Sequence, residues 1–430
     1  MDTSAAPDDR LELERTQLER LRVLLAALQP ANAFYGKKLS GLKLDGSLAE
    51  FMAKAPFTLK RELIEDQQAH GPFGSNLTYP LERYTRFHQT SGSMGRPMRW
   101  LDTAEDWQAL LECWKRVFAA AHVGASDRVF FAFSFGPFLG FWTAFEAALQ
   151  LGCMCIPGGG MSSQARLQAI LENEATVLCC TPTYALRLAE VAREEGLRME
   201  RSRVRTILVA GEPGGSAPAT RLRIEQHWPG ARVYDHHGMT EVGPVSYACP
   251  ARSDVLHVIE EAYLAEVVDP QSGRAATPGK PGELVLTTLL RTGSPLLRYR
   301  TGDWVQAATV SPCPCGSVEL ALEGGILGRT DDMVVVRGVN VYPSAVDEVV
   351  RSCGEVAEYR VSVYESRGMT EIKVTIEPDS KCADAQGLAR RLEERLREAF
   401  HLRVPVDTVS NGALPRFEMK AKRWARRDAE

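Results

Sequence analysis

The chain has 430 residues, a formal net charge of -4, an apolar fraction of 44% and a charged fraction of 25%. Such a length is too great for one compact core, so we expect two or three domains. The composition is that of a globular enzyme, and the weak negative charge gives no electrostatic reason to expect nucleic acid or an anionic membrane as a partner.

The start of the chain is acidic and polar, without the basic region and apolar core of a signal peptide. The most apolar stretch, residues 129–156, is interrupted by polar residues and glycines, which favours a buried strand-loop-helix unit over a membrane span. These features predict a cytoplasmic protein with no membrane partner. Its ten cysteines then indicate reduced thiols or metal ligands, because disulfide frameworks are typical of small secreted proteins.

The first predicted element is a helix that begins near Asp9. Its leucines lie close to one helical face. They are Leu11, Leu18, Leu21, Leu25 and Leu28. We expect this stripe to pack on the body of the protein, and contact with a second subunit, as in a homodimer, is the alternative.

Residues 88–97, HQTSGSMGRP, predict a loop between an extended segment and a helical one. Small hydroxyl residues and glycines let backbone N–H groups and hydroxyls converge on a phosphate. The residues that fit this role are Thr90, Ser91, Gly92, Ser93 and Gly95. The loop lacks the lysine of a Walker A motif. Taken alone, it reads equally well as a surface turn.

Between residues 107 and 290, short apolar runs alternate with helical segments. The runs are 129–133, 176–180 and 205–210, and the helices are 163–173 and 184–195. This alternation predicts a largely parallel sheet in a layered α/β fold. Ligand-carrying loops should follow the strands, and Gly211, Glu212 and Pro213 occupy such a place.

Residues 263–300 change to strands and turns, which predicts a small β-rich subdomain. After Arg329 the pattern restarts with strands at 333–337, 359–364 and 371–376 and helices at 345–351 and 386–400. We therefore predict an α/β protein with a large N-terminal domain (1–330) of layered sheets and a small α+β C-terminal domain (331–430).

Five segments in this order resemble the adenylate-forming superfamily of acyl-CoA synthetases, adenylation domains and luciferases. They are Thr90–Pro97, His237–Glu241, Tyr299–Asp303, Gly328–Asp332 and Leu414–Arg416 with Lys420. The run Arg337–Pro343 and the element Cys313–Gly316 are most similar to the phenylacetate-CoA ligase group. The resemblance extends from about Phe51 to Arg426.

This resemblance implies that the protein activates a carboxylic acid as acyl-AMP with ATP and Mg²⁺ and then passes the acyl group to coenzyme A. The loop at Thr90 would hold pyrophosphate, although Met94 and Met98 stand where threonine and lysine are common in the family. Glu241 would hold Mg²⁺ and Thr240 would meet the α-phosphate. Without this context, the Thr-Glu pair would be read as a helix N-cap.

The resemblance also assigns residues to the nucleoside. His237 replaces the usual tyrosine beside adenine, where Gly211, Glu212 and Pro213 line the same site. Asp303 would anchor the ribose, because one carboxylate can accept hydrogen bonds from both hydroxyls. Arg329 would add a second nucleotide contact. Taken alone, Asp303 would be a turn residue.

In the family the C-terminal domain is mobile, and Asp331 matches its hinge between an adenylating and a thioester-forming pose. Lys420 fits the catalytic lysine that bridges the substrate carboxylate and the α-phosphate. Lys422 competes for this role, but its spacing from Leu414–Arg416 is less suitable. The basic cluster at this end could otherwise be a solvated tail.

Cys249, His257, Cys313 and Cys315 could together form a Cys3His zinc site of the structural type. Four unrelated residues are the alternative.

Phe135, Phe138, His236 and Gly238 are the candidate acid pocket, in a region with a high density of aromatic residues. Aromatic walls favour an aryl ring over a long acyl chain, so we expect an aromatic carboxylic acid as substrate. Core packing is the default role for at least half of the aromatic residues here. Two other functions stay open, namely transfer of the acyl group to a carrier protein or an amine, and a regulator that binds a nucleotide without catalysis. Glu241, Asp303 and Lys420 argue against the regulator.

Overall fold

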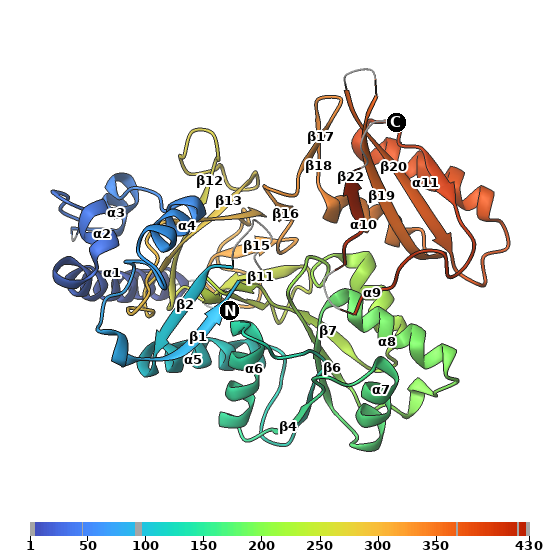
Figure 1. Cartoon of the computed structure of the whole chain (residues 1–430), viewed down its shortest axis with the longest axis horizontal. Coiled ribbons are helices and arrows are strands. Elements are labelled where there is room, and N and C mark those ends of the chain that lie inside the picture. The colour runs from blue at the N-terminus through green and yellow to red at the C-terminus, as the bar shows by residue number, and fades with distance from the viewer. Residues whose placement is uncertain (1–4, 45, 91–96, 367–368, 419–420, 427–430) are drawn as a thin grey trace.

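The computed structural model describes residues 5–44, 46–90, 97–366, 369–418 and 421–426 (Figure 1). Within these ranges, no helix combines the length and the apolar character that a membrane crossing requires.

A five-stranded parallel sheet forms the centre of the larger part of the molecule. Its spatial order is β4 (Met154–Pro157), β3 (Arg128–Phe131), β5 (Val177–Cys180), β6 (Thr206–Val209) and β7 (Arg232–Asp235). The helices of this region are α6 (Leu139–Gln150), α7 (Ser163–Glu172), α8 (Pro182–Glu194) and α9 (Pro218–His227). Phe130 and Phe131 are neighbours in β3, and their side chains are buried in two different hydrophobic cores. Both faces of the sheet are therefore covered. The predicted layered α/β arrangement is confirmed.

Antiparallel sheets make up the next part of the chain, as the change in pattern predicted. One sheet has the order β12 (Tyr263–Val268), β13 (Pro281–Thr288), β14 (Tyr299–Gln306) and β16 (Gly328–Arg329). A second contains β10 (Ser246–Ala248), β11 (Val255–Val258) and β15 (Ala321–Glu323). Two hairpins complete this part, β1 (Tyr84–Gln89) with β2 (Arg99–Thr103) and β8 (Gly238–Met239) with β9 (Gly243–Pro244). Helix α5 (Ala104–Ala120) follows β2 and packs against it.

The N-terminal helices cover one end of the antiparallel region (Figure 1). They are α1 (Ala5–Ala31), α2 (Ala33–Lys38), α3 (Leu48–Lys54) and α4 (Lys60–Ala69). Leu21, Leu25 and Leu28 of the predicted stripe are buried, whereas Leu11 is 51% exposed. Gln17 donates hydrogen bonds to backbone carbonyls of the body, so α1 packs within this chain, as favoured.

The C-terminal residues form a separate core beneath a mixed sheet of order β21 (Val406–Thr408), β20 (Met369–Pro378), β19 (Val356–Ser366) and β22 (Trp424–Arg426). Helices α10 (Pro343–Ser352) and α11 (Ala385–Phe400) pack on it, and the hairpin of β17 (Val334–Val336) and β18 (Val339–Val341) precedes them. Strand β22 pairs with β19, and Arg423 is buried against Glu358. The solvated-tail alternative is therefore wrong for Arg423, because its guanidinium is paired inside the domain.

A buried ion pair ties three distant segments together. Arg291, which follows β13, donates two hydrogen bonds to Asp102 of β2, at 2.6 and 2.9 Å. Its remaining nitrogen donates to the carbonyls of Thr240 and Glu241, at 2.9 and 2.8 Å. Burial alone would raise the pKa of Asp102, but the Arg291 charge, together with hydrogen bonds from His88 and Arg291, lowers that pKa below its ordinary value.

We predict that Arg291→Ala lowers the free energy of unfolding by about 3–5 kcal/mol, because it leaves the Asp102 charge buried without a partner. Arg291→Lys should also destabilise the protein, since an ammonium cannot reproduce the bidentate contact with Asp102. Denaturant titration measures both effects. The control is Arg83→Ala, which removes an exposed pair with Glu105 and should cost at most about 1 kcal/mol. Equal losses in Arg291→Ala and the control would contradict the anchoring role.

Candidate active site

The predicted ligand loops lie at the carboxyl ends of β6 and β7, as expected for an open α/β sheet. Gly211 follows β6 with φ +92°, a left-handed conformation that glycine adopts without strain. Thr90 follows β1, and its hydroxyl accepts a hydrogen bond from the Met98 backbone N–H at 3.0 Å. The other predicted phosphate residues, Ser91, Gly92, Ser93 and Gly95, lie outside the described residues.

Thr240 and Glu241 lie in the turn of the β8–β9 hairpin, so the helix N-cap alternative is wrong. The strands approach closely because Gly238 has no side chain: a Cβ there would lie 2.8 Å from the Gly243 carbonyl oxygen. Glu241 is 5% exposed. Its carboxylate lies 3.2 Å from the ammonium of Lys60, the first residue of α4. Sequence reasoning missed Lys60, because no motif links it to a residue so far along the chain.

A continuous polar chain joins the predicted nucleoside residues. One oxygen of Asp303 accepts from His237 Nε2 at 2.9 Å, and the other accepts from Arg329 at 2.9 Å. Arg329 also pairs with Asp331 at 2.8 Å. Nδ1 of His237 is buried without a hydrogen-bond partner in the described part of the chain. The structure therefore brings His237, Asp303, Arg329 and Asp331 together, with one ring nitrogen left for a ligand.

Glu212 has a side-chain role that the sequence did not indicate. Its carboxylate accepts from the Thr183 backbone N–H at 2.8 Å, at the start of α8, and from the Ala421 backbone N–H at 3.0 Å. The adjacent Pro213 is exposed. Lys420 lies outside the described residues, but its neighbour Ala421 is thus bonded to the loop that follows β6.

The aromatic residues after β3 pack on one another. Phe133 stacks on Phe141 with ring centroids 4.1 Å apart, and Phe135 meets Trp142 at 4.8 Å. Phe138 contacts Phe141 at 5.9 Å, whereas Phe131 is fully buried in the core. The backbone N–H of Gln89 donates to the Pro137 carbonyl at 2.9 Å, and α6 packs on β8 and β9. This cluster therefore lies beside both the end of β1, at Gln89, and the β8–β9 hairpin.

His236 lies in a buried and mostly apolar environment. Its Nδ1 is 2.6 Å from the Ser246 carbonyl oxygen, which requires Nδ1 to carry the proton. The ring contacts Trp114 with centroids 4.3 Å apart. Burial lowers the pKa of His236 to about 4. At neutral pH the ring is uncharged, and its Nε2 is a hydrogen-bond acceptor.

The four predicted zinc ligands come together in space. One potential ligand atom from each of Cys249, His257, Cys313 and Cys315 lies within 4.8 Å of all the others. The Cys249 and Cys313 sulfurs are 3.7 Å apart, and Cys315 Sγ is 3.3 Å from His257 Nε2. His257 Nδ1 faces the Glu319 carbonyl at 3.4 Å, which directs Nε2 into the cluster.

Comparison with known proteins agrees with this geometry. Residues 87–289 match the AMP-binding enzyme family, and residues 338–427 match the AMP-binding enzyme C-terminal domain. The phenylacetate-coenzyme A ligase of Thermus thermophilus is 33% identical over 374 residues, which cover 86% of this chain and 82% of that protein.

Two solved structures of a 2-hydroxyisobutyryl-CoA ligase also resemble this chain. In its postadenylation state that enzyme superposes with a TM-score of 0.90 at 29% identity, covering 96% of this chain and 89% of that one. In its thioesterification state the TM-score is 0.72 at 30% identity, with coverages of 98% and 90%.

The chain belongs to the adenylate-forming superfamily of AMP-binding enzymes. Within it, the protein is an AMP-forming acid-CoA ligase of the phenylacetate-CoA ligase-like group.

We predict a pH-dependent contribution to stability from His236. Its pKa is about 4 in the folded chain and about 6.5 when unfolded, so the unfolded chain takes up a proton first as the pH falls. The free energy of unfolding of wild type should therefore fall by roughly 3 kcal/mol in total because of this group, mostly between pH 6.5 and 4, and should level off below pH 4. His236→Gln, which does not titrate, should lack this component in denaturant titrations at several pH values. His401→Gln changes an exposed histidine and is the control. Equal slopes for His236→Gln and wild type would contradict the assignment.

Proposed function

We propose that the protein activates an aromatic carboxylic acid with MgATP and transfers the acyl group to coenzyme A. The observation that carries this proposal is the meeting of His237, which follows β7, with Asp303 of β14 and Arg329 of β16, while Glu241 lies four residues after His237 in the β8–β9 turn. The phosphate loop would hold the leaving pyrophosphate, and Lys420 would neutralise charge between the attacking carboxylate and the α-phosphate. Positioning and electrostatics supply most of the rate enhancement in such a displacement.

We assign Mg²⁺ to Glu241. A hard cation of this kind needs one or two carboxylates together with substrate phosphates. Glu241 fits, because its buried carboxylate lies in the turn just after His237 and has only the long side chain of Lys60 as an ion-pair partner among the described residues. The ion would neutralise phosphate charge when bound. Lys60, released from Glu241, would then be free to contact a phosphate.

We assign the nucleoside to the polar chain around Asp303. The Asp303 carboxylate lies at the centre of this chain, next to His237 and Arg329, and its two oxygens are the acceptor type that a pair of ribose hydroxyls requires. The unpartnered Nδ1 of His237 suits a donor such as the adenine amino group. A buried polar atom without a partner is costly, so a ligand there recovers free energy.

We infer an aromatic acid from the aromatic cluster beside the Glu241 turn. Phe135 and Phe138 offer ring faces and edges, which suit a flat substrate ring. His236 adds a neutral acceptor, which favours an acid that also carries a hydroxyl or amino group. A compact hydroxylated aliphatic acid is therefore the second candidate, and the solved relative is named for such an acid.

We predict ATP-pyrophosphate exchange that depends on an aromatic acid, followed by formation of the acyl-CoA. The test is a panel of aromatic, hydroxylated aromatic and aliphatic acids, including 2-hydroxyisobutyrate. Lys420→Ala should reduce exchange at least about a thousandfold, since it removes the charge that meets the carboxylate and the phosphate. The same variant should keep most of its acyl transfer from a supplied acyl-AMP to coenzyme A.

Lys422→Ala is the matched control and should retain exchange. No exchange with any acid would overturn the proposal, and exchange without acyl-CoA formation would favour a carrier protein or an amine as acceptor.

We also propose that Cys249, His257, Cys313 and Cys315 bind a structural Zn²⁺. Two sulfurs bound tetrahedrally at about 2.3 Å lie about 3.8 Å apart, and a sulfur and an imidazole nitrogen about 3.6 Å apart. The 3.7 and 3.3 Å distances in the structure are close to these values. Four protein ligands leave no open position, so the ion would join the segments around β10, β11 and residues 313–315.

We predict about one zinc per chain in purified protein, and a loss of most of it in Cys315→Ser. Elemental analysis measures the metal, and thermal unfolding should shift downward in the variant because the ion stabilises only the folded chain. Cys353→Ser changes a thiol outside the cluster and is the control. Equal zinc content in Cys315→Ser and wild type would refute the site.

A further inference from the structure

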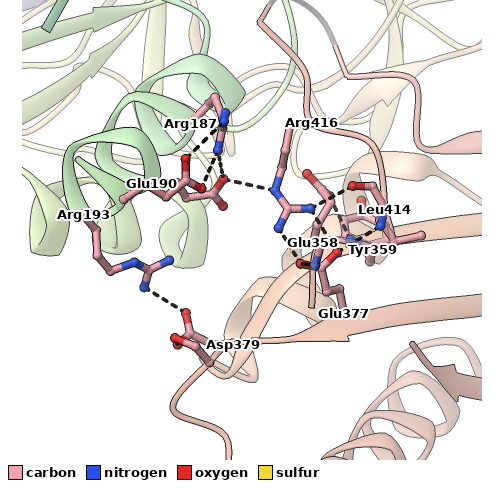
Figure 2. Close-up of polar contacts among 12 residues, drawn as sticks. Arg187, Glu190, Arg193, Glu358, Tyr359, Glu377, Asp379, Leu414 and Arg416 are labelled. Carbon is pink, nitrogen blue, oxygen red and sulfur yellow. Dashed lines mark hydrogen bonds and ion pairs between the residues drawn. The ribbon is translucent and has the colours of Figure 1, made fainter. Parts of the chain in front are cut away.

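Helix α8 of the N-terminal part faces the C-terminal sheet through charged residues (Figure 2). Arg416 lies between the two parts. Its Nε donates to Glu190 of α8 at 3.2 Å, and its two terminal nitrogens donate to both oxygens of Glu377, which belongs to β20. Glu377 is fully buried. Arg416 is therefore fixed within the C-terminal domain, and Glu190 contacts it from outside.

A second ion pair crosses the same interface. Arg193, one turn further along α8, lies 3.3 Å from Asp379, the residue that follows β20 (Figure 2). The two pairs have opposite charge arrangements. Helix α8 supplies the acidic residue in one pair and the basic residue in the other. This arrangement fixes which residues of β20 face α8, because a shift along the helix would bring like charges together.

The segment on both sides of Lys420 contacts the same region. Glu418 accepts from the hydroxyl of Ser163, the first residue of α7, at 3.0 Å. Ala421 donates to Glu212, as described above, and Arg423 approaches the Thr183 hydroxyl at 3.4 Å. Helices α7 and α8 and the segment after β6 thus contact the described residues on both sides of Lys420.

We propose that Glu190 and Arg193 are positioning residues that hold the C-terminal domain in the arrangement for adenylation, and so set the balance between the two half-reactions. This inference rests on the proposed two-step function. The superposition supports it, because the TM-score is 0.90 with the relative in its postadenylation state and 0.72 in its thioesterification state. Contacts specific to one arrangement stabilise that arrangement relative to the other.

The strength of these contacts suits a reversible arrangement. The paired side chains of Arg416 and Glu190 are 23% and 18% exposed, and that of Arg193 is 48% exposed. Ion pairs with this access to water are weak and are screened by salt. Loss of Glu190 leaves Arg416 bound to Glu377. It also removes the pair of Glu190 with Arg187 inside α8, but Arg187 keeps Glu194 as a partner.

The test compares ATP-pyrophosphate exchange with acyl transfer from a supplied acyl-AMP to coenzyme A. For Glu190→Gln, the ratio of exchange to transfer should fall about two- to fivefold, and for Glu190→Gln combined with Arg193→Gln about tenfold. The ratio is the decisive quantity, because it follows the populations of the two arrangements whichever one dominates. High salt should lower the ratio in wild type and have little effect on it in the double variant.

Glu194→Gln is the matched control, since Glu194 pairs with Arg187 within α8 and should leave the ratio unchanged. The positioning role would be overturned if wild type supports exchange and the double variant has the same ratio of exchange to transfer. It would also be overturned if Glu194→Gln changed this ratio as much as the double variant does. Small-angle scattering gives a readout independent of activity. The charge reversal Glu190→Lys with Arg193→Glu should alter the scattering profile even if no acid supports exchange, and an unaltered profile would count against the positioning role alone.

Discussion

The buried pair of Arg291 and Asp102 is the constraint on which the geometry of the site depends. Both side chains are removed from water, so each charge is tolerable only while the other lies beside it. The same guanidinium holds the carbonyls of Thr240 and Glu241. Strand β2, the segment after β13 and the turn of the β8–β9 hairpin are therefore linked, and the backbone that carries the carboxylate assigned to Mg²⁺ is anchored before any substrate binds.

The contacts between domains have the opposite character. Glu190 and Arg193 of α8 keep access to water, and their partners Arg416 and Asp379 belong to the C-terminal domain, which has its own core. A buried pair is costly to separate, whereas a hydrated pair exchanges its partner for water at little cost. An enzyme that must hold phosphates rigidly and yet release one domain between steps needs both kinds of pair. In this chain the buried pair lies in the N-terminal part, and the hydrated pairs lie between that part and the C-terminal domain.

The spacing of apolar residues along the chain predicted most of the fold, because it depends directly on which side chains are buried. Strands β3, β5 and β6 and helices α7 and α11 lie within a few residues of their predicted ranges. Lys60, Arg291 and Glu190 could not be predicted, since each acts through a partner far away in the chain and an isolated charged residue has no distinctive pattern. The hairpin at Thr240 could not be predicted either, because it depends on the close approach of Gly238 to Gly243.

The adjacent histidines after β7 show how one short segment can serve two sides of a site. Successive side chains of an extended segment point in opposite directions, so His236 and His237 enter different surroundings. His236 is buried beside Trp114 and bonded to Ser246, which keeps its ring neutral. His237 instead faces Asp303 and the polar chain assigned to the nucleoside. The residue assigned to the acid pocket and the residue assigned to the nucleoside are joined by a single peptide bond. In the proposed function, the rigidity of this backbone would therefore limit the relative placement of the two substrates.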